Sequence, residues 1–490
     1  MAGFHTGLER FCLVRGEDAY GQLGALSGDA PTLAEVANPF LELEYSPVLR
    51  AVDAARANIT ALGDINGDGQ SDFAYSTPSR GVQVFFGGGP DPDPTPDITI
   101  TSPDQAGAFN HELGWSLSGL GDINGDSRPD FAVGARYMTH PSGVDNGGSL
   151  FVFFGRDAGS LWPSSIEVLP NPACGADICF HGSERVAYLG SSVTATNFDG
   201  AGAADLVIGA RNRTQGATQR VGRAYVLLGG AQLDVPSGTV FELPGADLQG
   251  FTLDPPTTGT RSFGFDIAAV GSGNDARGDL VISALGRSQE GINAEVFYVT
   301  GRTYIGPSGL TAATAPSPFA VGSPGTFSTL RAAGDITGDS FADVWVSTNL
   351  AAGGVSPVYL GRGNGFSGVR LFGFTNDVVT DFWGTYVATG AHPDLGNFAD
   401  LDQNGFAEVF VGSLAYDPAG TLEDAPGTAE LFYSDATTGA RTRSGADVHF
   451  GSLNGQLTPG FVGDVTGDGY ADAVLLDSGG ANPSTLTLLY

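Results

Sequence analysis

The nonapeptide Asp64-Ile65-Asn66-Gly67-Asp68-Gly69-Gln70-Ser71-Asp72 places oxygen-bearing side chains at its positions 1, 3, 5 and 9 around a glycine turn. Calcium is a hard cation that takes about six to eight oxygen ligands at roughly 2.3–2.6 Å. A tight turn that folds alternate carboxylates inward supplies most of such a coordination shell. The nonapeptide therefore predicts a calcium loop.

Copies of this pattern begin at residues 64, 122, 197, 271, 335, 400 and 464, and we number them loops 1 to 7. Five copies, loops 1, 2, 5, 6 and 7, predict calcium sites, about five Ca²⁺ ions in all. Each predicted site also includes the residue at position 7. The predicted ligands are Asp64, Asn66, Asp68, Gln70 and Asp72 in loop 1; Asp122, Asn124, Asp126, Arg128 and Asp130 in loop 2; Asp335, Thr337, Asp339, Phe341 and Asp343 in loop 5; Asp400, Asp402, Asn404, Phe406 and Glu408 in loop 6; and Asp464, Thr466, Asp468, Tyr470 and Asp472 in loop 7.

Loops 3 and 4 depart from the pattern. Loop 3 has Ala201 at position 5, and loop 4 keeps only Asp275 and Asp279 among its acidic positions. We expect these two loops to bind calcium weakly or not at all.

Short apolar runs follow each loop and predict β-strands. Residues 72–75 and 130–133 illustrate the run directly after a loop, and residues 150–154 illustrate a second run further on. A more polar segment, such as 166–168 or 241–243, is typical of an outer edge strand. With a repeat of roughly sixty to seventy-five residues, four strands per repeat predict an all-β fold, a seven-bladed β-propeller with calcium-binding loops.

Two dipeptide motifs flank the loops. An apolar residue followed by Gly precedes a loop at Leu113-Gly114, Leu189-Gly190, Phe263-Gly264, Trp383-Gly384 and Phe450-Gly451, and Gly-Ala or a close substitute follows at Gly134-Ala135, Gly209-Ala210, Ser283-Ala284 and Gly412-Ser413. Together with the acidic loops, these motifs resemble the FG-GAP repeat propeller of integrin α subunits and its bacterial and fungal relatives, over about residues 40–490. The resemblance implies that partners dock on the face opposite the calcium loops.

The repeats divide the chain into an N-terminal extension, residues 1–37, and a single propeller, residues 38–490. The last repeat ends after its third strand, whereas residues 40–45 alternate like an outer strand. We expect this N-terminal strand to complete the seventh blade and close the ring. No secretory leader opens the chain, so we expect a mature or truncated form.

The formal net charge of −32 argues against nucleic acid or an anionic membrane as a partner, because both require clustered positive charge. Five bound Ca²⁺ ions would bring this charge to about −22. No apolar run is long enough to cross a membrane. Weak surface calcium loops suit the millimolar calcium found outside cells, so we expect an extracellular or cell-surface protein.

The three cysteines of the sequence allow two interpretations. A disulfide between Cys174 and Cys179 would staple a glycine-containing loop and leave Cys12 over; the alternative is three reduced thiols in apolar niches.

The motifs of serine hydrolases, zinc proteases and P-loop enzymes are absent from the sequence. We therefore expect a non-catalytic recognition or adhesion module that binds a protein or a carbohydrate. A lectin in the strict sense and a polysaccharide-acting lyase or hydrolase are the alternatives. Candidate ligand-binding residues lie in long segments after the second strands: Arg136, Tyr137, His140, Arg211 and Arg213.

Arginine offers a planar fork for a carboxylate or sulfate, although a solvated surface loop explains the same arginines. Trp115, Trp345 and Trp383 fall within strands, where core packing is the expected role.

Overall fold

The computed structural model describes residues 41–43, 58–77, 81–88, 95–103, 111–140, 142–169, 174–214, 220–245, 247–256, 260–271, 277–285, 294–304, 306, 309–318, 320–321, 327–336, 341–348, 355–359, 370–375, 383–388, 391–392, 396–397, 399–413, 428–434, 441–442, 446–451, 456–478 and 484–489. The predicted extension 1–37, Cys12, Thr337, Asp339 and Asp275 lie outside these residues.

The regular elements of the described residues are all β-strands, which confirms the all-β class. None of these residues forms a helix long and apolar enough to cross a membrane. We number the larger sheets in chain order. Sheet 1 contains β2 (Asn58–Gly63), β3 (Asp72–Thr77), β4 (Gly81–Phe85), β5 (Ile98–Thr101) and β9 (Ser165–Glu167). Sheet 2 contains β6 (Leu113–Gly121), β7 (Asp130–Ala135), β8 (Ser149–Phe153), β10 (Ile178–Gly182) and β14 (Thr239–Leu243). Sheet 3 contains β11 (Leu189–Thr196), β12 (Asp205–Ala210), β13 (Ala224–Leu227), β15 (Gly250–Asp254) and β19 (Leu310–Thr314).

The second half of the chain continues in the same way. Sheet 4 contains β16 (Phe263–Val270), β17 (Asp279–Ala284), β18 (Glu295–Val299) and β20 (Ala320–Val321). Sheet 5 contains β21 (Phe327–Gly334), β22 (Asp343–Thr348), β23 (Val355–Tyr359), β24 (Arg370–Thr375) and β30 (Arg441–Thr442). Sheet 6 contains β25 (Trp383–Ala388), β28 (Val409–Ser413), β29 (Thr428–Phe432) and β31 (Val448–Gly451). Sheet 7 contains β32 (Gln456–Gly463), β33 (Asp472–Ser478), β34 (Ser484–Leu489) and β1 (Leu41–Leu43), and a separate two-stranded sheet pairs β26 (Ala391–His392) with β27 (Gly396–Asn397).

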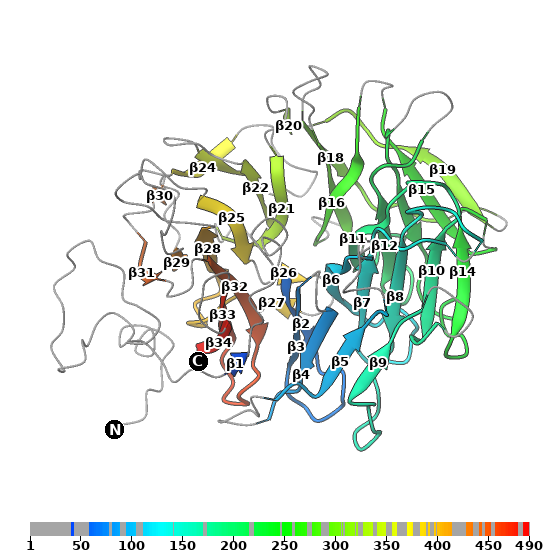
Figure 1. Cartoon of the computed structure of the whole chain (residues 1–490). Coiled ribbons are helices and arrows are strands. Elements are labelled where there is room, and N and C mark those ends of the chain that lie inside the picture. The colour runs from blue at the N-terminus through cyan, green and yellow to red at the C-terminus, as the bar shows by residue number, and fades with distance from the viewer. Residues whose placement is uncertain are drawn as a thin grey trace, which may run out of the picture.

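The first strands of these sheets contact one another in succession. Strand β2 contacts β6, β6 contacts β11, and the series continues through β16, β21 and β25 to β32, which contacts β2 again. Figure 1 shows the sheets following one another in this order, with β32 and β33 returning beside β2 and β3. Small sheets in such a succession are consistent with a β-propeller.

The central strands of each sheet are covered on both faces. All six residues of β7, of β12 and of β17 are buried. Strands covered on both faces are expected to be continuously apolar instead of alternating, which explains the unbroken apolar runs after the loops. Trp345 in β22 is fully buried, as predicted, whereas Trp115 in β6 is half-buried and the side chain of Trp383 is outside the described residues.

Two segments predicted as outer edge strands do lie at sheet edges, but each belongs to the preceding sheet and not to the sheet of its own repeat. Residues 166–168 and 241–243 were expected to form the fourth strands of their own repeats. Instead β9 pairs in parallel with β5 of the preceding sheet, and β14 pairs in parallel with β10. The fourth position of sheet 2 is taken by β10, whose five residues are all buried, while β9 buries only Ile166. A strand with one apolar residue fits an outer fifth position better than a fourth one.

Close backbone contacts between neighbouring sheets explain the paired glycine motifs. A Cβ atom placed on Gly134 would lie 2.2 Å from the carbonyl oxygen of Gly190, so these backbones touch with no room for a side chain. Gly190 itself has a φ of 76°, in the left-handed region that favours glycine. The Ser116 hydroxyl donates to the same Gly190 carbonyl at 2.9 Å.

This junction recurs along the chain. Ser76 donates to the carbonyl of Gly114, and Ser192 donates to that of Gly264. The apolar-Gly and Gly-Ala motifs therefore form the contact between one sheet and the next.

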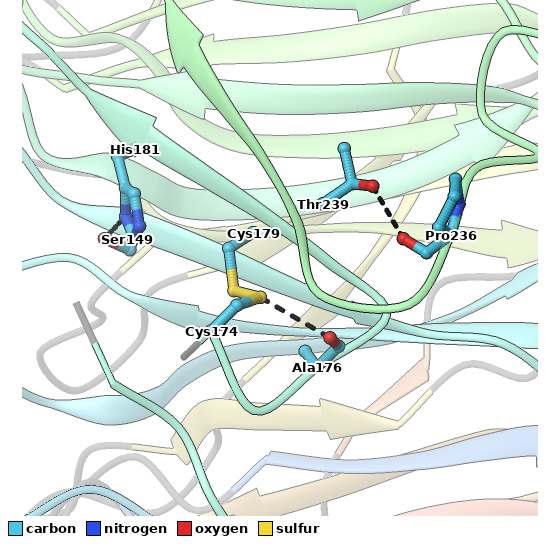
Figure 2. The surroundings of a disulfide bond; sticks show 7 residues. All are labelled: Ser149, Cys174, Ala176, Cys179, His181, Pro236 and Thr239. Carbon is cyan, nitrogen blue, oxygen red and sulfur yellow. Dashed lines mark hydrogen bonds between the residues drawn. A yellow bond between two sulfur atoms is a disulfide. The ribbon is translucent and has the colours of Figure 1, made fainter. Parts of the chain in front are cut away.

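A disulfide joins Cys174 to Cys179 of β10, with their Cα atoms 5.9 Å apart, which confirms the predicted pairing. Figure 2 shows it beside His181, whose Nδ1 lies 2.7 Å from the hydroxyl of Ser149. Both cysteines are buried in the apolar core that sheets 1 and 2 share. The disulfide thus fixes the entry to the fourth strand of sheet 2.

Strand β1 pairs antiparallel with β34, and Leu41 lies opposite Leu486. The N-terminal segment therefore occupies the outer edge of the sheet that contains the C-terminal strands. This position is the one that the alternation of residues 40–45 predicts for a closing strand.

We predict that Gly134→Ala destabilises the protein by about 1–3 kcal/mol, because a methyl group has to displace the Gly190 backbone. Gly271→Ala is the matched control, since a Cβ atom there meets nothing within 4 Å. Thermal and urea unfolding of both variants measure the difference. Equal stabilities would contradict the proposed contact role of the glycine motifs.

We predict that deletion of residues 38–47 lowers the melting temperature substantially, because it removes the strand paired with β34. Deletion of residues 1–37 is the comparison, and it should leave the melting temperature nearly unchanged. Differential scanning calorimetry distinguishes the two. An unchanged melting temperature for the first deletion would exclude ring closure by this strand.

Candidate metal centre and ligand face

The acidic loops follow the first strands of their sheets, and their position-1 carboxylate organises the turn. In loop 1 the Asp64 carboxylate accepts the backbone N–H of Asp68 at 2.9 Å and that of Gly69 at 2.8 Å. The amides of positions 5 and 6 bind the position-1 carboxylate in the same way in the other described loops, at Asp122, Asp400 and Asp464. Hydrogen bonds within the chain therefore hold the turn without the help of a cation.

Positions 3 and 5 are held by shorter-range bonds. The Asn66 side chain accepts the N–H of Asp68 and donates its amide to the Asp68 carboxylate, both at 2.9 Å. The Asp68 carboxylate also accepts the N–H of Gln70 at position 7. These bonds direct the side chains of alternate residues toward the same side of the turn.

Position 9 links the loop to a different strand. The Asp72 carboxylate is fully buried, and it accepts the N–H of Ile65 at 2.8 Å and that of Gly87, which follows β4, at 2.9 Å. Equivalent pairs of amides serve Asp130, Asp205 and Glu408. The carboxylate at position 9 thus ties loops 1, 2, 3 and 6 to the end of the third strand of their own sheets.

This burial is electrostatically costly. Burial raises the pKa of Asp72 to about 8, although the amides of Gly87 and Ile65 oppose the shift, and the neighbouring charges of Asp68 and Asp64 raise it further. Burial likewise raises the pKa of Glu408 to about 9. A cation beside these groups would favour their ionised form and offset the cost.

The residues fit a calcium ion. In loop 6, oxygens of Asp400, Asp402 and Glu408 lie within 4.8 Å of one another. In loop 7, Oδ1 of the buried Asp472 has no hydrogen-bond partner among the described residues. All of these donors are oxygens, which suit Ca²⁺ better than softer metals.

Part of loop 5 lies within the described residues, and loop 2 differs from the other loops at Arg128. Asp335, Phe341 and Asp343 of loop 5 are described, and Asp343 is buried and accepts the N–H of Ile336 at 3.1 Å. In loop 2 the guanidinium of Arg128 lies 3.2 Å from Asp126 and also pairs with Asp157. Arg128 therefore places a positive charge at the rim of loop 2, where it would compete with a cation for Asp126.

Loops 3 and 4 keep position 9 although they have lost other ligands. Asp205 retains both backbone partners, and Asp279 accepts the N–H of Gly301 at 2.7 Å and the hydroxyl of Tyr298. The tie to the third strand therefore persists where the coordination set does not.

The candidate ligand-binding residues follow β7 and β12, at the ends opposite loops 2 and 3. Arg136 is buried, forms an ion pair with buried Glu112, and lies over the rings of Trp115 and Tyr137. The guanidinium of Arg211 lies 5.5 Å from the centre of the Trp115 ring. Trp115 therefore brings Arg136 and Arg211 together.

Arg211 also lies 5.7 Å from the ring centre of Tyr188 and 5.2 Å from that of Phe265. These two residues and Trp115 were missed as candidate site residues. Trp115 and Phe265 each follow the glycine of an apolar-Gly motif, and that shared register is the signal that could have identified them. We call Trp115, Arg136, Tyr188, Arg211 and Phe265 the arginine–aromatic cluster.

His140 and Arg213 have other surroundings. His140 is buried, with its Nε2 3.2 Å from Glu242 and its Nδ1 2.7 Å from the hydroxyl of Ser142. Arg213 pairs with Glu184 at 3.1 Å and lies 3.6 Å from Asp254. Carboxylates of the chain itself therefore neutralise Arg213.

Comparisons with known proteins agree with the repeat pattern. Residues 113–153 match the family model of the FG-GAP repeat. The chain is 40% identical over 85 residues to integrin alpha-PS2 of Drosophila melanogaster, which is 16% of this chain and 6% of that protein. It is 27% identical over 236 residues to phosphatidylinositol-glycan-specific phospholipase D of Mus musculus, 46% of this chain and 25% of that protein. The chain thus spans a quarter or less of these relatives.

We predict that Asp205→Ala and Asp68→Ala separate the structural tie from metal binding. Asp205→Ala should lower the free energy of unfolding by about 2–3 kcal/mol with or without calcium, because two amides lose their acceptor. Asp68→Ala should lower stability in calcium and have little effect in chelator. Urea unfolding in both conditions measures this, and a calcium-dependent effect of Asp205→Ala would contradict the assignment.

Proposed function

Residues 113–153 match the FG-GAP repeat, and from that premise we propose that this chain is a calcium-stabilised recognition module of a seven-bladed propeller. Its ligand is a protein or a carbohydrate, and the chain carries out no chemistry of its own. The observation that carries the proposal is the hydrogen-bonded turn that loops 1, 2, 6 and 7 share, together with the three carboxylates of loop 6 whose oxygens lie within 4.8 Å of one another.

The calcium role is structural. The loops with complete ligand sets each have two or three carboxylates close together. Their mutual repulsion is stronger because the carboxylate at position 9 is buried away from water. Calcium bound by loops 1, 2, 5, 6 and 7 would neutralise these groups and lock the turns. The repulsion would then no longer oppose the close packing of the loops.

An extracellular or cell-surface location agrees with two features of the chain. The disulfide between Cys174 and Cys179 is favoured in an oxidising compartment. Loops of modest affinity suit millimolar calcium. The similarity to an integrin α subunit supports the same location and an adhesive role.

The ligand site we propose is the arginine–aromatic cluster at the end opposite the calcium loops. Half-buried Trp115 and Tyr188 offer ring faces, and half-buried Arg211 offers a planar fork to a carboxylate or sulfate. The rings hold the guanidinium in place and so reduce the entropy lost on binding. Acidic protein segments and acidic sugars fit this chemistry, and neutral sugars that stack on aromatic rings are the narrower, lectin-like alternative.

A catalytic role has less support. The similarity to phosphatidylinositol-glycan-specific phospholipase D covers a quarter of that protein, and the name describes that enzyme's activity. The clustered carboxylates of this chain are accounted for by the loop turns. Release of products from an acidic polysaccharide would favour an enzyme over a recognition module.

We predict that a chelator lowers the melting temperature by several degrees, and that an acidic glycan or peptide raises it in calcium. A panel of acidic and neutral glycans and acidic peptides serves as the probe. No effect of the chelator would remove the calcium role.

Arg211→Ala should abolish the ligand-induced shift, because the guanidinium carries the proposed contact. Arg302→Ala is the matched control and should leave the shift intact, because the backbone amide of Arg302 binds the carbonyl of Phe198 in loop 3, at the other end of the sheets. Equal shifts in the two variants would exclude the arginine–aromatic cluster as the ligand site.

A further inference from the structure

Backbone hydrogen bonds connect loops 1, 2, 3, 5 and 7 to the sheet that follows each of them. The carbonyl at position 1 accepts the N–H at position 8 of the next loop. This bond joins Asp122 to Ala204 at 2.9 Å, Asn197 to Gly278 at 2.7 Å, Asp335 to Ala407 at 3.1 Å, and Asp464 to Ser71 at 3.0 Å. A second bond runs from the amide after the third strand of the next sheet to the carbonyl at position 2, as from Gly88 to Val465 at 3.2 Å.

The bonds from loop 7 to loop 1 join opposite ends of the chain. We call this contact, made by Asp464, Val465, Ser71 and Gly88, the seam. It is tightly packed, because a Cβ atom on Gly87 would lie 2.6 Å from the carbonyl oxygen of Ser71 and 3.1 Å from that of Val465. Next to it, an apolar cluster packs Phe73 and Phe85 of sheet 1 with residues of sheet 7.

The pairing of β1 with β34 also connects the chain ends, but it involves three residue pairs. The seam therefore supplies a separate connection, and it lies between two loops that keep their predicted ligand sets.

The junction between loops 1 and 2 offers an internal comparison. Position 8 of loop 2 is Pro129, which has no N–H, so the position-1 carbonyl of loop 1 cannot receive this bond. That junction retains the bond from Arg156 to the carbonyl of Ile65 at 2.8 Å. The fold thus tolerates proline at position 8 of a loop. At the seam, position 8 is Ser71, and its N–H makes the hydrogen bond that Pro129 cannot make.

We propose that loops 7 and 1 form a calcium-dependent latch at the seam, and that calcium binding at these two loops is positively coupled. The Asp464 carbonyl belongs to a predicted ligand of loop 7, and the Ser71 amide lies next to the predicted ligand Asp72 of loop 1. Ordering of either loop therefore holds the donor or the acceptor of the hydrogen bond from Ser71 to Asp464 in place. The entropic cost of ordering the second loop is then lower. The inference rests on the calcium part of the proposed function.

The test is Ser71→Pro in the full chain, with Ser71→Ala as the matched control that keeps the N–H. Isothermal titration with calcium should show affinity weakened about threefold to tenfold at two sites in the proline variant, as the loss of one backbone hydrogen bond implies. Adding Asp68→Asn, which disables loop 1, should weaken loop 7 by a similar factor in the alanine background and leave it unchanged in the proline background.

Hydrogen exchange of the unmodified protein gives a second test that does not depend on the variant folding. A chelator should accelerate exchange at Ser71 and Gly88 more than at Ala204 and Gly278, whose junctions adjoin the degenerate loops 3 and 4. Equal acceleration at both pairs would overturn the latch.

The titration outcomes separate the two proposals. Absence of calcium binding in every variant would refute the calcium role itself. Calcium binding that is the same in Ser71→Pro and Ser71→Ala would refute the latch and leave the calcium role standing.

Discussion

The buried carboxylate at position 9 is the interaction on which the other features of the loops depend. Asp72, Asp130, Asp205 and Glu408 each accept one amide from the start of their own loop and one from beyond the third strand. A single side chain thereby joins the ends of the first and third strands of the same sheet. Because loop 3 keeps this arrangement without a full ligand set, the tie belongs to the fold, and the proposed calcium would add to it.

The local part of the structure could be predicted from the sequence, because it depends on residues close together in the chain. The turn around Asp64 and the buried run after Asp72 follow from spacing and apolar content alone. The partner of an outer strand could not be predicted in this way: β9 has one buried residue, so its own sequence suits the edge of either neighbouring sheet. The choice was decided by β10, which fills the inner position of sheet 2.

For the candidate ligand-binding residues too, the sequence predicted which residues matter but not which distant residues they contact. The sequence identified Arg136 and Arg211 because arginines stand out in an acidic chain, but it gave no indication that Glu112 pairs with Arg136. Glu112 lies 24 residues away and precedes an apolar-Gly motif, at a φ of 51°. Tyr188 occupies the equivalent place before the next such motif, at a φ of 58°. The repeat register thus brings both residues to this end of the sheets, a relation that residue type alone does not reveal.

The two ends of the molecule are connected by the second strands. Strand β7 begins at Asp130 of loop 2 and is followed directly by Arg136, and β12 begins at Asp205 of loop 3 and is followed by Arg211. Both strands are buried along their whole length, so a shift of one residue would reverse the faces of every side chain. A change in the loops therefore cannot reach the arginine–aromatic cluster by sliding these strands. Of the two loops, loop 2 alone keeps a predicted ligand set, so calcium proposed there would support the cluster through β7 and Arg136.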